Sequence, residues 1–165
     1  LLVNGKSQGI RRKEGCHRLT WDEVIYEPGI LVARALDADG KVITEVSRKT
    51  AGVAVKIRLS ADRRLIDGDG DDLAFVTIDA LDADGNIHPT ADDRIKVTVS
   101  GGGELAATGN GDPTSLNGFT SPYISLFNGR ALAIVRGKKG TNDTIKVTAE
   151  AAHLSTDTIT TGLEI

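Results

Sequence analysis

The chain repeats one hexapeptide, Ala-Leu-Asp-Ala-Asp-Gly, without change at residues 35–40 and 80–85. Each copy follows a run of β-forming residues. An Asp-Gly pair in this setting is a strong signal for a hairpin, because aspartate and glycine tolerate the positive φ of a tight primed turn. The copies lie much closer together than the roughly 100 residues of a complete sandwich. They therefore predict one hairpin used twice in a β-rich chain, not a duplicated domain.

Apolar and polar residues alternate in several other segments, which is the pattern of half-buried β-strands. The clearest are residues 55–59, 95–99 and 145–150. Asn-Gly and Asp-Gly pairs punctuate these runs often enough to close many short antiparallel strands. No segment has a convincing helical periodicity. The pattern predicts an all-β fold of the immunoglobulin-like β-sandwich class.

We expect two modules, residues 1–51 and residues 52–165. The boundary falls near Thr50, where one strand-rich stretch ends before a new strand starts at Val55. The chain opens on Leu-Leu-Val-Asn-Gly, which is typical of the end of a strand entering an Asn-Gly turn, and it carries no methionine. We therefore expect a segment excised from a longer protein, in which residues 52–165 form the complete sandwich.

Charge and hydropathy exclude several classes of partner. The net charge of −3 and a pI near 5.6 provide no long-range attraction for nucleic acid or an anionic membrane. No apolar run approaches the roughly 18 residues that a membrane-spanning helix needs. The single cysteine excludes a disulfide within the chain. We expect neither a nucleic-acid partner nor a membrane span in this chain.

One acidic run resembles a metal site. It contains Asp67, Asp69, Asp71 and Asp72. Oxygen ligands at alternate positions can surround calcium, but an EF-hand loop requires glycine at its sixth position and glutamate at its twelfth. This chain has Asp72 and Ile78 there. We therefore favour a solvated acidic turn and keep a weak calcium site as the alternative.

No residue pattern predicts catalysis or a cofactor. The histidines at 17, 88 and 153 are scattered and lack a zinc-ligand partner at a usual spacing. Cys16 and His17 are adjacent, so in a strand their side chains would point to opposite faces. The serines between 115 and 125 lack a nucleophile elbow. We predict no catalytic residue and no cofactor.

The segment from Gly101 to Phe127 is the longest irregular stretch and is dotted with aromatic residues. Long loops on sandwiches often carry contacts. A sugar-binding sandwich is a further possibility, although Trp21 is expected to fill the core from a strand at 17–24. The candidate contact residues are Asn110, Asp112, Phe119, Tyr123 and Phe127.

Motifs along the whole chain resemble one enzyme family. In the first half they lie at residues 1–7, 17–21, 26–29 and 37–42, and in the second half at 57–63, 71–77, 109–115 and 127–133. Together they resemble the C-terminal sandwich region of bacterial glycoside hydrolase family 2 β-galactosidases. The strands and turns of the second half also resemble the immunoglobulin-like repeats of bacterial invasin-type adhesins.

The resemblance implies a non-catalytic C-terminal accessory fragment of a β-galactosidase. In that family two glutamates on an upstream (β/α)8 barrel perform retaining hydrolysis, and no part of the barrel is present here. The fragment is expected to act as a scaffold, a spacer or a contact surface for that barrel, in a secreted or periplasmic bacterial enzyme. A cell-surface adhesin segment and a carbohydrate-binding sandwich are the alternatives.

The resemblance also implies that residues 1–51 are the C-terminal part of an incomplete β-sandwich, whose early strands lie upstream. The two hexapeptides then fall on either side of the junction between the two domains. An incomplete sandwich exposes apolar core and an unpaired strand edge, which favours a homodimer.

Overall fold

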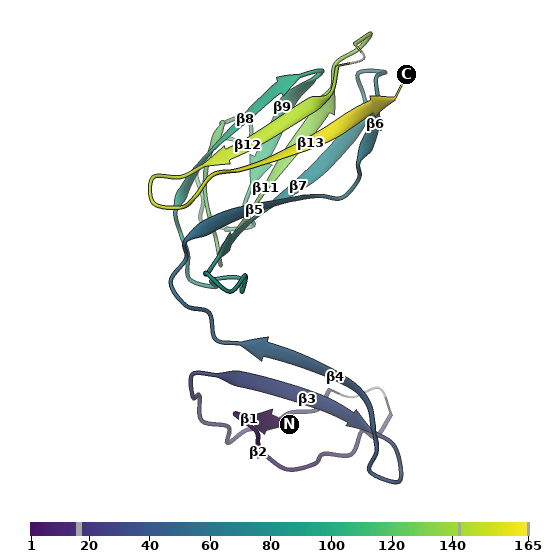
Figure 1. The fold of residues 1–165 in the computed structure, drawn as a ribbon, viewed down its shortest axis with the longest axis vertical. Coiled ribbons are helices and arrows are strands. Elements are labelled where there is room, and N and C mark those ends of the chain that lie inside the picture. Colours follow the sequence, from purple (N-terminus) through teal and green to yellow (C-terminus); the bar gives the residue numbers. More distant parts are fainter. Residues whose placement is uncertain (16–17, 142, 165) are drawn as a thin grey trace. The chain divides into compact units, whose positions relative to one another are not determined.

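A computed structural model describes residues 1–15, 18–141 and 143–164. These residues form thirteen β-strands (Figure 1). A helix able to cross a membrane is absent from this described part of the chain. The strands belong to two compact units, unit 1 at Leu1–Thr50 and unit 2 at Ala51–Ile165. The prediction of an all-β fold is confirmed.

Unit 1 is a single antiparallel sheet in the order β2-β1-β3-β4. Its strands are β1 (Leu2–Val3), β2 (Lys6–Ser7), β3 (Ile30–Leu36) and β4 (Val42–Lys49). Asn4 and Gly5 connect β1 to β2 with positive φ angles of 48° and 81°, as expected for an Asn-Gly turn. Among the described residues of this unit, Val3 alone is buried. Unit 1 therefore has strands but almost no core of its own.

Unit 2 contains two sheets. The four-stranded sheet has the order β5-β7-β11-β9 and the five-stranded sheet has the order β10-β8-β12-β13-β6. Most neighbours are antiparallel, but β13 pairs in parallel with β6. The strands are β5 (Lys56–Ala61), β6 (Leu65–Asp67), β7 (Leu73–Leu81), β8 (Arg94–Gly101), β9 (Gly103–Gly109), β10 (Tyr123–Ser125), β11 (Arg130–Gly137), β12 (Ile145–Glu150) and β13 (Asp157–Glu164).

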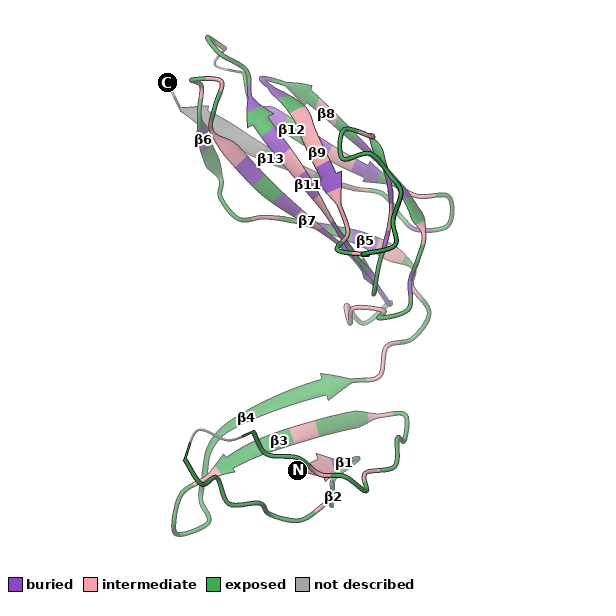
Figure 2. Cartoon of the chain, turned by 180° about the vertical axis from the view of Figure 1, so that it is seen from behind, coloured by how far each residue is buried: buried purple, intermediate pink, exposed green. Residues whose placement is uncertain are grey.

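The core of unit 2 lies between these two sheets. Inward side chains alternate along the strands, as Figure 2 shows for β7 and β11. Ile78 of the four-stranded sheet and both Ile95 and Ile145 of the five-stranded sheet have no exposed surface. Burial of an aliphatic side chain of this size contributes about 1.5–3 kcal/mol. The alternating segments predicted from the sequence thus form the core strands of a β-sandwich.

The two hexapeptides form the same turn. The N–H of Gly40 donates to the Asp37 carbonyl at 3.2 Å, and the N–H of Gly85 donates to the Asp82 carbonyl at 3.2 Å. Only the glycines take a positive φ, 82° and 89°. The expected primed turn is therefore wrong, because the aspartate before each glycine keeps a negative φ. The geometry is that of a type I turn closed by a left-handed glycine.

The two turns have different outcomes. The first joins β3 to β4 in a full hairpin, as predicted. After the second, pairing is limited to the bridge Leu81↔Ile87, and the chain then continues to β8 in the other sheet. The same hexapeptide therefore closes a hairpin in unit 1, whereas in unit 2 it comes before the point where the chain crosses to the other sheet.

Asp82 also fastens the first residues of unit 2. Its Oδ2 accepts the N–H of Gly52 at 2.8 Å, while Nδ1 of His88 lies 2.7 Å from the carbonyl oxygen of Gly52. Three residues later the N–H of Val55 donates to the Leu81 carbonyl at 2.8 Å. The segment leading into β5 is thus tied to the second hexapeptide turn.

Candidate functional site

The long segment between β9 and β10 is built as an ordered loop. The N–H of Thr108 donates to the Phe119 carbonyl at 2.6 Å, and its hydroxyl donates to the Ser121 carbonyl at 2.9 Å. The tip presents Phe119, which is 76% exposed, and Leu116, which is fully exposed. Sequence reasoning missed Leu116, although an isolated leucine in a run of polar and turn-forming residues was the available signal.

Two polar residues predicted for this contact surface serve the loop itself. Nδ2 of Asn110 donates to the Ser125 carbonyl at 2.9 Å. Oδ1 of Asp112 accepts both the N–H and the hydroxyl of Thr114, at 2.8 and 2.7 Å. These two hydrogen bonds hold the pKa of Asp112 below its usual value. The side chains of Asn110 and Asp112 therefore shape the loop rather than reach outward.

The two remaining aromatic residues lie at different places from the loop tip. Phe127 precedes the tight turn into β11 and is 37% exposed. Tyr123 lies on β10 and lines a pocket of about 350 Å³. The five predicted contact residues therefore do not form one continuous site.

The Tyr123 pocket lies across three neighbouring strands. Tyr123 pairs with Lys96, and Lys96 pairs with Glu150, so the three side chains point to the same face of the sheet. Arg94, two residues before Lys96 on β8, places its guanidinium carbon 4.9 Å from the centroid of the Tyr123 ring. This arrangement is a cation–π contact. Because the guanidinium covers one ring face, that face cannot also stack on a sugar.

The pocket also lacks the groups for glycoside hydrolysis. Retaining hydrolysis requires two carboxyl groups roughly 5–5.5 Å apart. Among the described residues that line this pocket, Glu150 supplies the one carboxylate. The pocket does not present the pair of carboxylates that cleaves a glycosidic bond.

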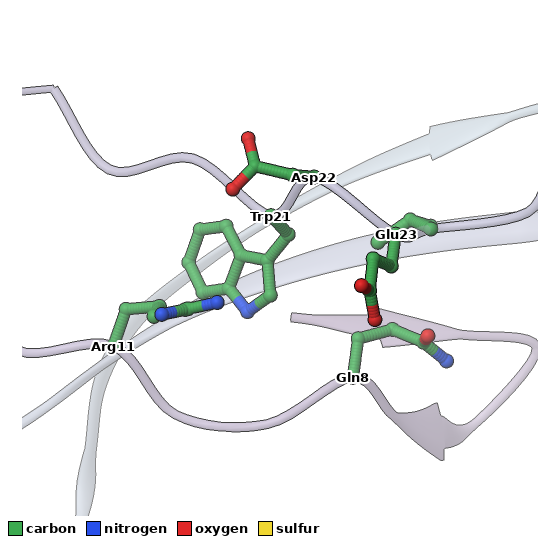
Figure 3. A pocket seen from close by; sticks show the side chains of 6 residues that line it. Gln8, Arg11, Trp21, Asp22 and Glu23 are labelled. Carbon is green, nitrogen blue, oxygen red and sulfur yellow. The ribbon is translucent and has the colours of Figure 1, made fainter.

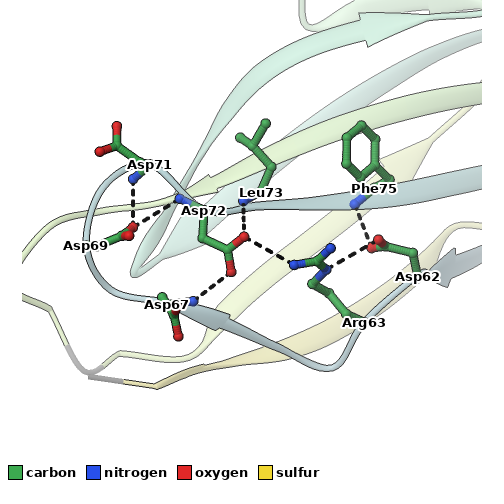
Figure 4. Close-up of polar contacts among 8 residues, drawn as sticks. All are labelled: Asp62, Arg63, Asp67, Asp69, Asp71, Asp72, Leu73 and Phe75. Atoms are coloured by element: carbon green, nitrogen blue, oxygen red, sulfur yellow. Dashed lines mark hydrogen bonds and ion pairs between the residues drawn. The ribbon is translucent and has the colours of Figure 1, made fainter.

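The acidic run forms a turn stabilised by its own carboxylates (Figure 4). Oδ1 of Asp69 accepts the N–H groups of Asp71 and Asp72 at 2.8 and 3.0 Å, which lowers the pKa of Asp69. Asp72 accepts the N–H of Asp67 at 2.9 Å and an N–H of Arg63 at 3.1 Å. These carboxylates thus already have protein donors. Among the residues that the structure describes, no three acidic, histidine or cysteine side chains converge as metal ligands.

A second pocket, of about 360 Å³, lies in unit 1 beside Trp21. In Figure 3 the guanidinium of Arg11 lies beside the indole ring, and Glu23 points toward Gln8. Nε1 of Trp21 donates to the Gly9 carbonyl at 3.2 Å. The described residues 18–24 form no strand and the indole is only partly buried. The expectation that Trp21 fills a core from a strand is therefore wrong.

The histidine and cysteine predictions have separate outcomes. His88 contacts Gly52, as described above, and His153 is exposed on a turn. The predictions for Cys16 and His17 fall outside the described residues. The described histidines are thus a structural and a surface residue.

Family comparisons cover most of the chain. Glycoside hydrolase family 2 C-terminal domain 5 matches residues 57–160. A second family, Domain of unknown function (DUF4982), matches residues 1–44. The two matches fall in different compact units.

Individual relatives are much longer than this chain. The chain is 41% identical over 144 residues to the Beta-galactosidase BoGH2A of Bacteroides ovatus, covering 85% of this chain and 17% of that protein. The solved structure of a glycosyl hydrolase family 2 member from Bacteroides cellulosilyticus is 31% identical with a TM-score of 0.90, covering 99% of this chain and 21% of that one. A beta-glycosidase from Bacteroides vulgatus, 22% identical with a TM-score of 0.89 over 98% of this chain and 20% of its own, shares the fold. The chain spans about a fifth of the length of these relatives.

Proposed function

The chain belongs to the glycoside hydrolase family 2 C-terminal domain 5 family, and from this membership we propose that it is a non-catalytic accessory part of a glycoside hydrolase. The observation that carries the proposal is one of length. Nearly the whole chain aligns with about a fifth of each relative, and the remaining four-fifths is more than enough for the roughly 250 residues of a catalytic barrel. The chain would act as a scaffold, a spacer or a contact surface for that barrel.

We further propose that the complete polypeptide is a retaining β-galactosidase of a bacterial periplasm or cell surface. The named Bacteroides ovatus relative supports this substrate. In the retaining enzymes that this chain resembles, the two catalytic glutamates lie on the barrel, so we assign that role to no residue of this chain. The exposed tip at Leu116 and Phe119 is the part of the loop best suited to touch the barrel.

The 165-residue chain is expected to release no nitrophenol from a nitrophenyl β-galactoside, because the catalytic pair is proposed to lie on the barrel outside it. Absorbance of free nitrophenolate measures the reaction. The complete polypeptide at the same molar concentration is the matched control and should show turnover. Comparable turnover by the pure 165-residue chain would overturn the accessory role.

Unit 1 is proposed to be the C-terminal part of a β-sandwich whose remaining strands lie upstream. Val3 is buried, yet Ile43 is 67% exposed and Val46 is 56% exposed on β4. Apolar side chains at this exposure on one strand favour a covering sheet. The complete polypeptide would supply that cover.

Without such a cover, the 165-residue chain is expected to associate with a second copy. Size-exclusion chromatography with light scattering measures the mass over a concentration series. The variant Ile43→Thr and Val46→Thr keeps β-branched side chains while it reduces the apolar surface, and it should shift the chain toward monomer. A monomeric unsubstituted chain at every concentration would contradict the incomplete-sandwich proposal.

A further inference from the structure

The outer face of the four-stranded sheet in unit 2 carries an apolar patch. On β7 and β11, Phe75 lies directly opposite Ile134, and Ile134 lies opposite Ala107 on β9. Directly opposed residues project from the same face of a sheet. Leu132 and Leu73 lie on that face two residues along their strands. We call Leu73, Phe75, Ala107, Leu132 and Ile134 the sheet patch.

The sheet patch faces away from the core. The neighbouring residues Ala74, Val76, Ala133 and Val135 take the buried positions between the sheets. Phe75 remains 38% exposed, and the other four residues are partly buried. The patch is therefore apolar surface beyond what the core of unit 2 uses.

The opposite outer face of the same sandwich is polar. On β8 and β12 the outward positions alternate with buried valines and isoleucines. They are Lys96, Thr98, Lys146, Thr148 and Glu150. A sheet with one solvated face shows this pattern. The outer face that carries the sheet patch does not show this alternating polar pattern.

Charged residues border the sheet patch at both ends. At one end Asp79, whose side chain is 4% exposed, accepts hydrogen bonds from Arg58 at 2.6 Å and Arg130 at 2.9 Å. At the other end Arg136 lies 3.8 Å from Glu104. Beside Phe75, Oδ1 of Asp62 accepts the Phe75 N–H at 2.8 Å, and the Asp62 carboxylate pairs with Arg63. The border of the sheet patch therefore carries charges of both signs. An apolar centre with a polar, charged border is typical of a protein interface.

We propose that the sheet patch docks against another domain of the same polypeptide, which presents an apolar segment with a polar border. The inference rests on the proposed place of the chain in a longer polypeptide, about four-fifths of which lies outside this chain in its relatives. Arg58 and Arg130 are each about half exposed. Their free N–H groups can therefore donate to acceptors in that polar border.

The size of the sheet patch favours a tethered partner over a free one. Stable complexes between separate proteins use roughly 20–30 residues on each side, whereas the apolar centre here has five. A tether raises the local concentration of the partner to the millimolar range, so a small contact suffices.

Chemical labelling of a single cysteine tests this proposal. Phe75→Cys is made in the Cys16→Ser background, and its reaction with a maleimide is timed in the 165-residue chain and in the complete polypeptide. We expect labelling to be at least about tenfold slower in the complete polypeptide, which corresponds to about 1.4 kcal/mol of docking. Thr98→Cys on the polar outer face is the matched control and should react equally in both.

A second substitution keeps the test independent of the effect of the cysteine. Ile134→Asp in the complete polypeptide places a charge in the sheet patch and should restore rapid labelling at position 75. Thermal unfolding of the 165-residue chain with the same substitution establishes that unit 2 still folds.

Equal labelling rates at position 75 in both polypeptides would overturn the proposal. Concentration-dependent protection in the 165-residue chain would assign the face to a second copy instead. Because the labelling rate does not depend on hydrolysis, the result for docking is independent of the assay that tests the accessory role.

Discussion

Replacement of Gly129 by alanine is expected to destabilise unit 2 by about 3 kcal/mol. Gly129 follows Asn128 in the tight turn into β11, and its φ is 74°. An added Cβ would overlap the carbonyl oxygen of His88, which is a backbone atom and cannot rotate away. The Gly129 carbonyl also accepts the N–H of Ala80 at 2.9 Å, and the N–H of Gly129 donates to the Ala91 carbonyl at 3.1 Å. Relief of the overlap would therefore disturb two further backbone contacts.

Urea unfolding monitored by circular dichroism measures this loss. Gly111→Ala is the matched control, because Gly111 has a similar φ of 76° but open space around the position of a Cβ. That control isolates the cost of a left-handed alanine, about 1 kcal/mol. Equal losses in the two variants would show that the His88 carbonyl moves freely, contrary to the prediction.

Replacement of Asp82 by alanine is expected to lower the melting temperature of unit 2 by several degrees. The carboxylate accepts N–H groups of Gly52 and Asn86, each at 2.8 Å, and the Asn86 side-chain amide at 2.9 Å. Asp82 is buried, so its removal leaves these donors without their acceptor. The matched control is Asp37→Ala, at the equivalent position of the first hexapeptide, where Asp37 accepts from Asp39 and Lys41 inside its turn. A smaller loss is expected in the control.

The same residue predicts how stability depends on pH. Hydrogen bonds from the Asn86 side chain and from the N–H of Gly52 hold the pKa of Asp82 well below its usual value. A carboxyl with a lowered pKa stabilises the fold above its unfolded pKa of about 3.9, and this contribution is lost as the pH falls through the folded pKa. Melting temperatures measured from pH 5 to pH 2 should therefore fall less steeply for Asp82→Asn than for the unsubstituted chain. Parallel curves of melting temperature against pH would show that Asp82 does not cause this pH dependence.

The sequence predicted the strands of unit 2 because their alternation is local. Residues 95–99 and 145–150 fall in β8 and β12, and the turns fall at Asn-Gly and Asp-Gly pairs. The turn type was missed, because aspartate is compatible with both a primed turn and a type I turn closed by glycine. The destination of the chain after Gly85 was also missed, because it depends on which sheet offers a partner edge.

The functional surfaces were predicted less well for a related reason. A strand was predicted at 17–24, but a strand requires a partner, and the structure places the described residues 18–24 in a loop in which Trp21 contacts Gly9. The sheet patch had a signal that went unused. Residues 131–135 are continuously apolar, which suits a strand with apolar side chains on both faces. A strand of a sandwich with one solvated face alternates instead.

The parallel pairing of β6 with β13 has a mechanical consequence. Leu65, Ile66 and Asp67 pair in register with residues 162–164, and Lys56 forms a parallel bridge with Ser155. When the two ends of unit 2 are pulled in opposite directions, parallel strands slide along each other, and their hydrogen bonds bear the load together instead of opening one after another. Force transmitted along the polypeptide would thus meet a clamp between β6 and the last strand, β13, and forced unfolding would be governed by the rate at which that clamp ruptures.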